Sequence, residues 1–154
     1  MKKILIYGYG NPGRQDDGMG VLLADELEKW AEEKKYSNIS FETNYQLNVE
    51  DAEIISDKDF VLFIDASMEQ IEDIVYTKVT PDDSRIEFTM HAVSVSFIVD
   101  ICNKLFGKNP ETYLLHIKGY EWELAEGITE KARINFEKAL EFSKKKIIEQ
   151  LELN

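Results

Sequence analysis

Short apolar runs alternate along the chain with longer segments in which apolar residues recur every three or four positions. Residues 3–9 and 60–64 are almost continuously apolar, which is typical of strands buried on both faces of a sheet. Residues 39–43 alternate between apolar and polar side chains, which predicts a half-buried strand. Weaker strand patterns cover residues 74–79, 85–88 and 113–118.

Helical spacing covers the segments between these strands. Residues 19–34 carry apolar side chains spaced by four, four and three positions, and residues 95–106 repeat the pattern before Gly107, which can end that helix. A last helix is predicted to begin after Thr129 as its N-cap. Residues 49–56 are a candidate for a short additional helix.

Strands that alternate with helices predict one α/β domain over residues 1–154, with a largely parallel sheet of five or six strands and helices on both faces. No linker, repeat or low-complexity tract divides the chain, and its length suits one hydrophobic core. In open α/β sheets, ligands bind where loops leave the carboxyl ends of the strands. Candidate chemistry is therefore expected in these loops.

The composition narrows the class of partner. The chain has 18 basic and 30 acidic residues, a net charge of −12 and a pI near 4.6. Such a surface repels phosphate backbones and anionic lipids, so neither nucleic acid nor a membrane is expected as a partner. Cys102 is the only cysteine, the first apolar run is too short for a signal peptide, and no apolar stretch approaches the roughly 20 residues of a membrane span. We expect a cytoplasmic protein.

The loop after the first strand admits three interpretations. Residues 8–13, GYGNPG, match the GxGxxG dinucleotide motif, but the loop continues to Asp16 and Asp17 before the helix, and these carboxylates would repel a pyrophosphate. Its GNPG part is similar to the opening of bacterial peptidyl-tRNA hydrolases, which place a catalytic histidine soon afterwards, whereas the first histidine here is His91. The third interpretation treats the carboxylates themselves as functional.

Asp17 directly precedes the predicted helix, and Gly18 and Gly20 beside it allow close approach by another chain. The simpler explanation, which suits Asp16 best, is that an acidic residue favours a helix N-terminus electrostatically.

Two further residues fall at the same kind of position. Asp65 follows the apolar run 60–64, and His91 lies between a short strand and the helix 95–106. Alone, each has an ordinary structural explanation, a loop cap for Asp65 and a packed side chain for His91. Together with Asp17 they would form an open site of two oxygen ligands and one imidazole, which suits a divalent first-row metal. His116 lies in the middle of a strand and is interpreted as structural.

The whole chain resembles the hydrogenase maturation endopeptidases, which trim the large subunit of nickel–iron hydrogenases. The resemblance runs from Ile4 to about Lys146 and is strongest over residues 8–20, GYGNPGRQDDGMG. Further matching segments are FIDA at 63–66, TMH at 89–91, GYEWEL at 119–124 and EGIT at 126–129.

The resemblance implies a three-layer α/β/α sandwich of the phosphorylase/hydrolase-like type around a mixed, mainly parallel sheet. It implies an endopeptidase that removes the C-terminal extension of the hydrogenase large-subunit precursor once nickel is installed. We separately expect the protein to be a monomer. We expect the nickel to be carried by the substrate and not to be tightly bound in the free enzyme. The implied nickel-coordinating and catalytic residues are Asp17, Asp65 and His91, and the implied substrate-binding residues are Gly10, Asn11 and Asp16.

Two departures from the family pattern concern the substrate. Many members carry a Gly-Gly pair after the second strand, where this chain has NYQL at 44–47, and Asp17 stands where others have the longer Glu. Cys102 lies on the presumed core face of a helix, so no covalent nucleophile is apparent. The group that activates water stays open, with Asp16 as a candidate base or second-shell residue. The alternative function is a non-catalytic metal-sensing or chaperone-like binding protein that uses the same site.

Overall fold

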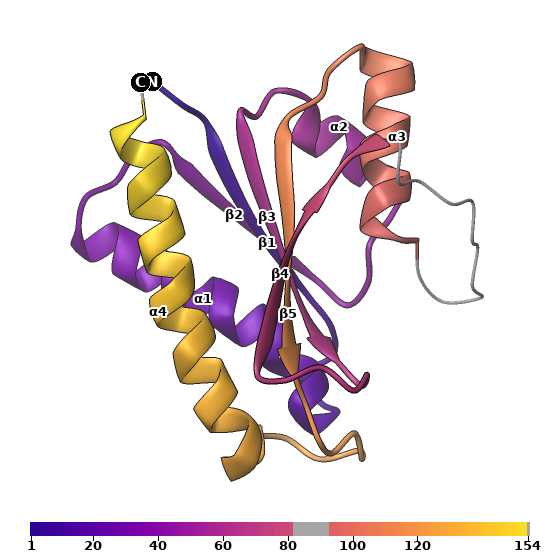
Figure 1. Cartoon of the computed structure of the whole chain (residues 1–154), viewed down its shortest axis with the longest axis vertical. Coiled ribbons are helices and arrows are strands. Elements are labelled where there is room, and N and C mark those ends of the chain that lie inside the picture. Colours follow the sequence, from indigo (N-terminus) through magenta and orange to yellow (C-terminus); the bar gives the residue numbers. More distant parts are fainter. Residues whose placement is uncertain (82–92, 154) are drawn as a thin grey trace.

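The computed structural model describes residues 1–81 and 93–153, and strands and helices alternate along this part of the chain (Figure 1). The strands are β1 (Ile4–Tyr9), β2 (Ile39–Asn44), β3 (Phe60–Ser67), β4 (Ile74–Val79) and β5 (Glu111–Lys118). The helices are the short 3₁₀ turn η1 (Gln15–Gly18), α1 (Met19–Glu33), α2 (Asp51–Ser56), α3 (Val95–Phe106) and α4 (Glu130–Glu152).

The described strands form one five-stranded sheet in the order β2-β1-β3-β5-β4. β2, β1, β3 and β5 are parallel, and β4 at the edge runs antiparallel to β5. The mixed, mainly parallel sheet predicted from the sequence is confirmed. The predicted strand at 85–88 lies outside the described residues.

Helices cover both faces of the sheet, which gives the predicted α/β/α sandwich. α1 and α4 lie on one face, and α2 and α3 lie on the other (Figure 1). Successive side chains of β3 alternate between the two cores: Leu62 and Ile64 pack with α1 and α4, whereas Val61 and Phe63 pack with α2 and α3. This double burial explains why residues 60–64 are continuously apolar.

The ends of the helices follow their sequence signals. The Thr129 side chain accepts a hydrogen bond of 3.2 Å from the backbone N–H of Ala132, as expected of the predicted N-cap. Gly107 ends α3 with a left-handed φ of 65°, as predicted. α4 is the longest described helix, with 23 residues, and no helix in the described ranges is both long and apolar enough to cross a membrane.

Two glycines bring the start of α1 against the carboxyl ends of the central strands. A Cβ added at Gly8 would collide with the carbonyl oxygen of Gly20, and a Cβ added at Gly20 would lie 2.6 Å from the carbonyl oxygen of Tyr9 and in collision with that of Ile64. The close approach predicted at Gly20 is therefore made by this chain's own strands. It places the residues before α1 directly beside the ends of β1 and β3.

Candidate functional site

Asp65 lies inside β3 and not beyond its end. The strand continues to Ser67 because its pairing with β5 continues as far as Lys118, so the predicted end at residue 64 was three residues too early. Ile64 and Ala66 belong to the core under α1 and α4, so the Asp65 side chain points to the opposite face. The carboxylate lies close to the carboxyl end of a central strand, which is where the sequence analysis sought a site.

Tyr9, the last residue of the neighbouring strand β1, interacts with Asp65. The Tyr9 hydroxyl and the Asp65 carboxylate each shift the pKa of the other. Burial, followed by the negative charge of Asp65, raises the pKa of Tyr9 well above its ordinary value. Sequence analysis missed Tyr9. The available signal was its place at the end of an apolar strand whose alternation puts it on the same face as Tyr7.

Asp17 lies in η1, immediately before α1, and its Oδ2 accepts a hydrogen bond of 2.8 Å from the backbone N–H of Asn11. The structure brings Asp17 and Asp65 to the same edge of the sheet. Burial first, and then the charge of Asp17, raises the pKa of Asp65 to about 7, against the smaller opposing effects of hydrogen bonds from the Ala66 N–H and the Tyr9 hydroxyl.

Two neighbouring carboxylates in a partly dehydrated site repel one another, and either a proton or a cation relieves that repulsion. Carboxylate oxygens suit a divalent metal, and an imidazole would complete a mixed ligand set. His91, the predicted third ligand, lies outside the described residues. Within residues 1–81 and 93–153, no group of three or more His, Cys, Asp or Glu side chains could hold a metal ion. Of the three predicted ligands, Asp17 and Asp65 lie within the described residues.

Asp16 has a different role from its neighbour. Its side chain has 0% exposure, and both carboxylate oxygens accept hydrogen bonds from the segment 120–129. Asp16 was predicted to bind substrate and was a candidate base; in the structure its carboxylate is fully buried and its described hydrogen bonds are made within this chain.

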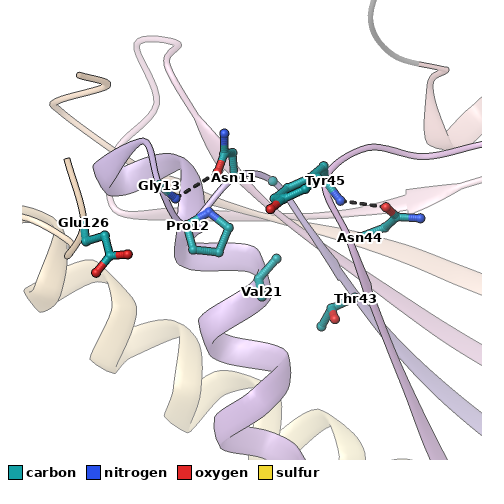
Figure 2. A pocket seen from close by; sticks show the side chains of 9 residues that line it. Asn11, Pro12, Gly13, Val21, Thr43, Asn44, Tyr45 and Glu126 are labelled. Carbon is teal, nitrogen blue, oxygen red and sulfur yellow. Dashed lines mark hydrogen bonds between the residues drawn. The ribbon is translucent and has the colours of Figure 1, made fainter. Parts of the chain in front are cut away.

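A pocket of about 430 Å³ opens beside the loop after β1 (Figure 2). The predicted substrate-binding residues Gly10 and Asn11 line it, and Asn11 links the pocket to Asp17 through its backbone N–H. In Figure 2, Asn11 and Pro12 lie between Glu126 on one side and Tyr45 on the other. The complete lining consists of Gly10, Asn11, Pro12, Gly13, Val21, Thr43, Asn44, Tyr45 and Glu126.

Two pocket residues were not predicted as site residues. Tyr45 has 72% of its surface exposed and stands in the segment where many members of the resembled family have Gly-Gly. The missing Gly-Gly pair was the sequence signal that could have pointed to Tyr45. Glu126 comes from the segment between β5 and α4, and only the folded chain brings it to the pocket.

Among the described contacts, two other reactive side chains make no hydrogen bond to Asp17 or Asp65. Cys102 is completely buried in α3, as its spacing predicted, and burial raises the pKa of its thiol. His116 is half-buried within β5, and burial lowers its pKa, which favours the neutral imidazole. The strand register pairs His116 with Asp65, although no hydrogen bond joins the two side chains among those described.

Comparison with known proteins identifies the fold. No protein-family model and no curated protein sequence matches the chain. Among solved structures, the chain is similar to the hydrogenase maturating endopeptidase HybD from E. coli, with a TM-score of 0.73 and 18% identity over 96% of this chain and 93% of that one. It is also similar to the NiFe hydrogenase maturation protease HycI from Thermococcus kodakarensis KOD1, with a TM-score of 0.71 and 21% identity over 92% and 89% of the two chains.

A third similar structure is the hydrogenase 2 maturation peptidase from Thaumarchaeota archaeon SCGC_AB-539-E09, with a TM-score of 0.65 and 16% identity over 99% of this chain and 100% of that one. In each of these comparisons the shared fold extends over nearly the whole length of both proteins. The chain therefore has the fold of hydrogenase maturation proteases.

Proposed function

We propose that this protein is an endopeptidase that removes the C-terminal extension of a nickel–iron hydrogenase large-subunit precursor after nickel has been inserted. The observation that carries the proposal is the pair Asp17 and Asp65 at the carboxyl edge of the sheet, on the fold of hydrogenase maturation proteases. The motif resemblance around both residues supports the same assignment independently of the fold.

Nickel arrives as part of the substrate, and Asp17, Asp65 and His91 complete its coordination. Without metal, burial opposes the charge on Asp65, and the nearby charge of Asp17 opposes it further. A divalent cation in the precursor would neutralise this unfavourable charge, so binding of the precursor is coupled to the presence of the metal. The protein then recognises a precursor that has received its nickel and passes over one that has not.

A metal ion held beside a peptide bond can polarise the carbonyl group or lower the pKa of a bound water. The Tyr9 hydroxyl interacts with Asp65 and favours its charged form. Asp16 is not proposed as the base, because its buried carboxylate already accepts four hydrogen bonds. The pocket beside Asn11 accepts polypeptide that flanks the scissile bond, and Tyr45 and Glu126 contact that polypeptide.

The test is to mix the purified protein with a large-subunit precursor, with and without nickel, and to follow intact masses. We expect loss of one C-terminal peptide only with nickel. Asp17→Ala, Asp65→Ala and His91→Ala should each abolish this loss while the variants stay folded. Asp25→Asn, at an exposed position of α1, is the matched control and should cleave normally. Normal cleavage by all three site variants would refute the site.

The alternative function is a non-catalytic metal-sensing or chaperone-like binding protein for hydrogenase assembly. Both functions predict nickel-dependent association with the precursor, and turnover separates them. An endopeptidase at one tenth of the precursor concentration processes nearly all of the precursor, whereas a binder only forms a complex. In either case we propose a cytoplasmic monomer whose partner is the precursor, with no role for nucleic acid or a membrane.

A further inference from the structure

The segment 119–129, which joins β5 to α4, lies alongside the loop that carries Asp17. The Arg14 guanidinium donates to the carbonyl oxygen of Trp122 through Nε at 3.3 Å and Nη2 at 3.2 Å. The backbone N–H of Gln15 donates to the carbonyl oxygen of Ala125 at 2.9 Å, and the Glu123 N–H donates to Gln15 Oε1 at 2.9 Å. Residues more than 100 positions apart are thus joined by both backbone and side-chain hydrogen bonds.

The Asp16 carboxylate lies at the centre of this contact. Its Oδ1 accepts a hydrogen bond from the backbone N–H of Thr129 at 2.8 Å. Its Oδ2 accepts hydrogen bonds from the N–H of Tyr120 at 2.8 Å, the N–H of Glu121 at 3.1 Å and the hydroxyl of Thr129 at 2.9 Å. Hydrogen bonds to a carboxylate are stronger than those between neutral groups, and this carboxylate has no exposed surface where water could compete.

The contact also reaches α4 and holds an unfavourable backbone conformation. Thr129 donates its hydroxyl to Asp16 and accepts from the Ala132 N–H, so one side chain caps α4 and binds the loop. Gln15 adopts a left-handed φ of 48°, which residues other than glycine rarely adopt. Such a conformation persists only where its surroundings determine it, and here the hydrogen bonds to segment 119–129 do so.

We propose that Asp16 is a positioning residue that fixes Asp17 and the Glu126 side of the pocket relative to one another. Asp17 follows Asp16 within the same short turn, so a peptide held at Asp16 determines where the Asp17 carboxylate points. Glu126 lies in the segment that Asp16 binds, so the same carboxylate sets one wall of the pocket. The role in catalysis rests on the proposed endopeptidase function, whereas the role in positioning does not.

The experiment compares Asp16→Asn with Asp51→Asn. Asparagine at position 16 keeps one acceptor oxygen but turns an amide N–H₂ group toward donors. Asp51 is a matched control, because it is also a buried carboxylate, 3% exposed, that accepts from the Tyr7 hydroxyl and the Asn48 N–H at 2.8 Å each, outside the contact with segment 119–129. Hydrogen exchange is read at single amides, and cleavage of nickel-loaded precursor gives kcat and KM.

In Asp16→Asn we expect exchange at least tenfold faster at the amides of Tyr120, Glu121 and Thr129. Exchange at the Asn11 amide should also become faster. This amide donates to Asp17 and not to Asp16, so its exchange reports whether Asp17 has moved. We expect kcat to fall by about 100-fold, the effect typical of a misplacement near 1 Å, while Asp51→Asn keeps the protection and kcat of the wild type. Wild-type protection at Asn11 in Asp16→Asn, or equal kcat values in the two variants, would overturn the proposal. If the wild type cleaves no precursor, the proposed function fails, and the exchange at Asn11 still decides whether Asp16 positions Asp17.

Discussion

At the scale of single residues, the sequence distinguished the functional carboxylates only in part. Asp17 and Asp65 were predicted from their places at strand and helix ends, and the structure brings them together. Asp16 was predicted to contact substrate, whereas its partners lie 104 to 113 positions further along the chain. No local pattern reports such partners, so two adjacent aspartates with different roles look equivalent in the sequence.

The raised pKa of Asp65 makes the stability of the protein depend on pH. The folded state favours the protonated acid, with a pKa of about 7 against an ordinary value of 3.8. The unfolded state loses this proton first, so the free energy of unfolding is unaffected well below pH 4, falls as the pH rises from about 4 to about 7, and is constant above that. We expect Asp65→Asn to stabilise the metal-free protein at pH 8 by about 2–4 kcal/mol and to have a much smaller effect at pH 5. Urea unfolding in the presence of a chelator measures both values, and an Asp65→Asn variant less stable than wild type at pH 8 would contradict this.

The repulsion between Asp17 and Asp65 can also be removed by neutralising Asp17. Asp17→Asn removes the nearby charge and should shift the pKa of Asp65 downward, although burial will keep it above the ordinary value. Titration of the side-chain carboxyl carbon by NMR measures the change. The control is Asp25→Asn, whose exposed position on α1 should leave the Asp65 titration where it is. An unchanged Asp65 pKa in Asp17→Asn would show that the two carboxylates do not interact.

At the scale of elements, periodicity located the described strands and helices but misplaced the ends of two central strands. β3 was predicted to stop at residue 64 and β5 to begin at residue 113, whereas they span Phe60–Ser67 and Glu111–Lys118. The missed residues include polar ones such as Asp65 and Thr112, which interrupt an apolar pattern. Hydrogen bonding between the two strands extends both of them, and pairing across a sheet is not written in either segment alone.

The contact between α1 and the sheet offers an experiment at this scale. Gly20→Ala would place a methyl group against the backbone carbonyl oxygens of Tyr9 and Ile64, so α1 must move away from the strands. Overpacking of this kind costs about 1–3 kcal/mol, and the displacement should also reduce cleavage because Asp17 precedes the helix. Glu26→Ala, at an exposed position of the same helix, should match the wild type in both urea unfolding and cleavage. A Gly20→Ala protein with wild-type stability would mean that the helix has room there.

At the scale of the whole molecule, the layered α/β architecture was predicted from the alternation of patterns, and the solved structures with the same fold are only 16–21% identical. A shared fold at such low identity is expected, because the layers depend on which positions are apolar and not on which apolar residue fills them. Under the proposed function, the choice of hydrogenase would depend on exposed pocket residues such as Tyr45 and Glu126, whose neighbours only the fold determines.

The acidic surface leads to a prediction about assembly. With a net charge of −12, copies of the chain repel each other at neutral pH. We expect light scattering at moderate ionic strength to give a molar mass near that of one chain, 17.8 kDa. A mass near twice this value, independent of salt, would contradict the proposed monomer.

The two chain ends lie side by side (Figure 1), where the Lys2 ammonium donates to Gln150 Oε1 at 2.8 Å. β1 starts near this point and runs away from it toward Asp17, and α4 returns from segment 119–129, so the ends lie at the opposite edge of the sheet from the candidate site. A short covalent link between them would close the backbone into a ring without crossing the molecule. Cyclisation would restrict the unfolded chain more than the folded one, so the ring should resist unfolding better and still leave the site open to a large protein substrate.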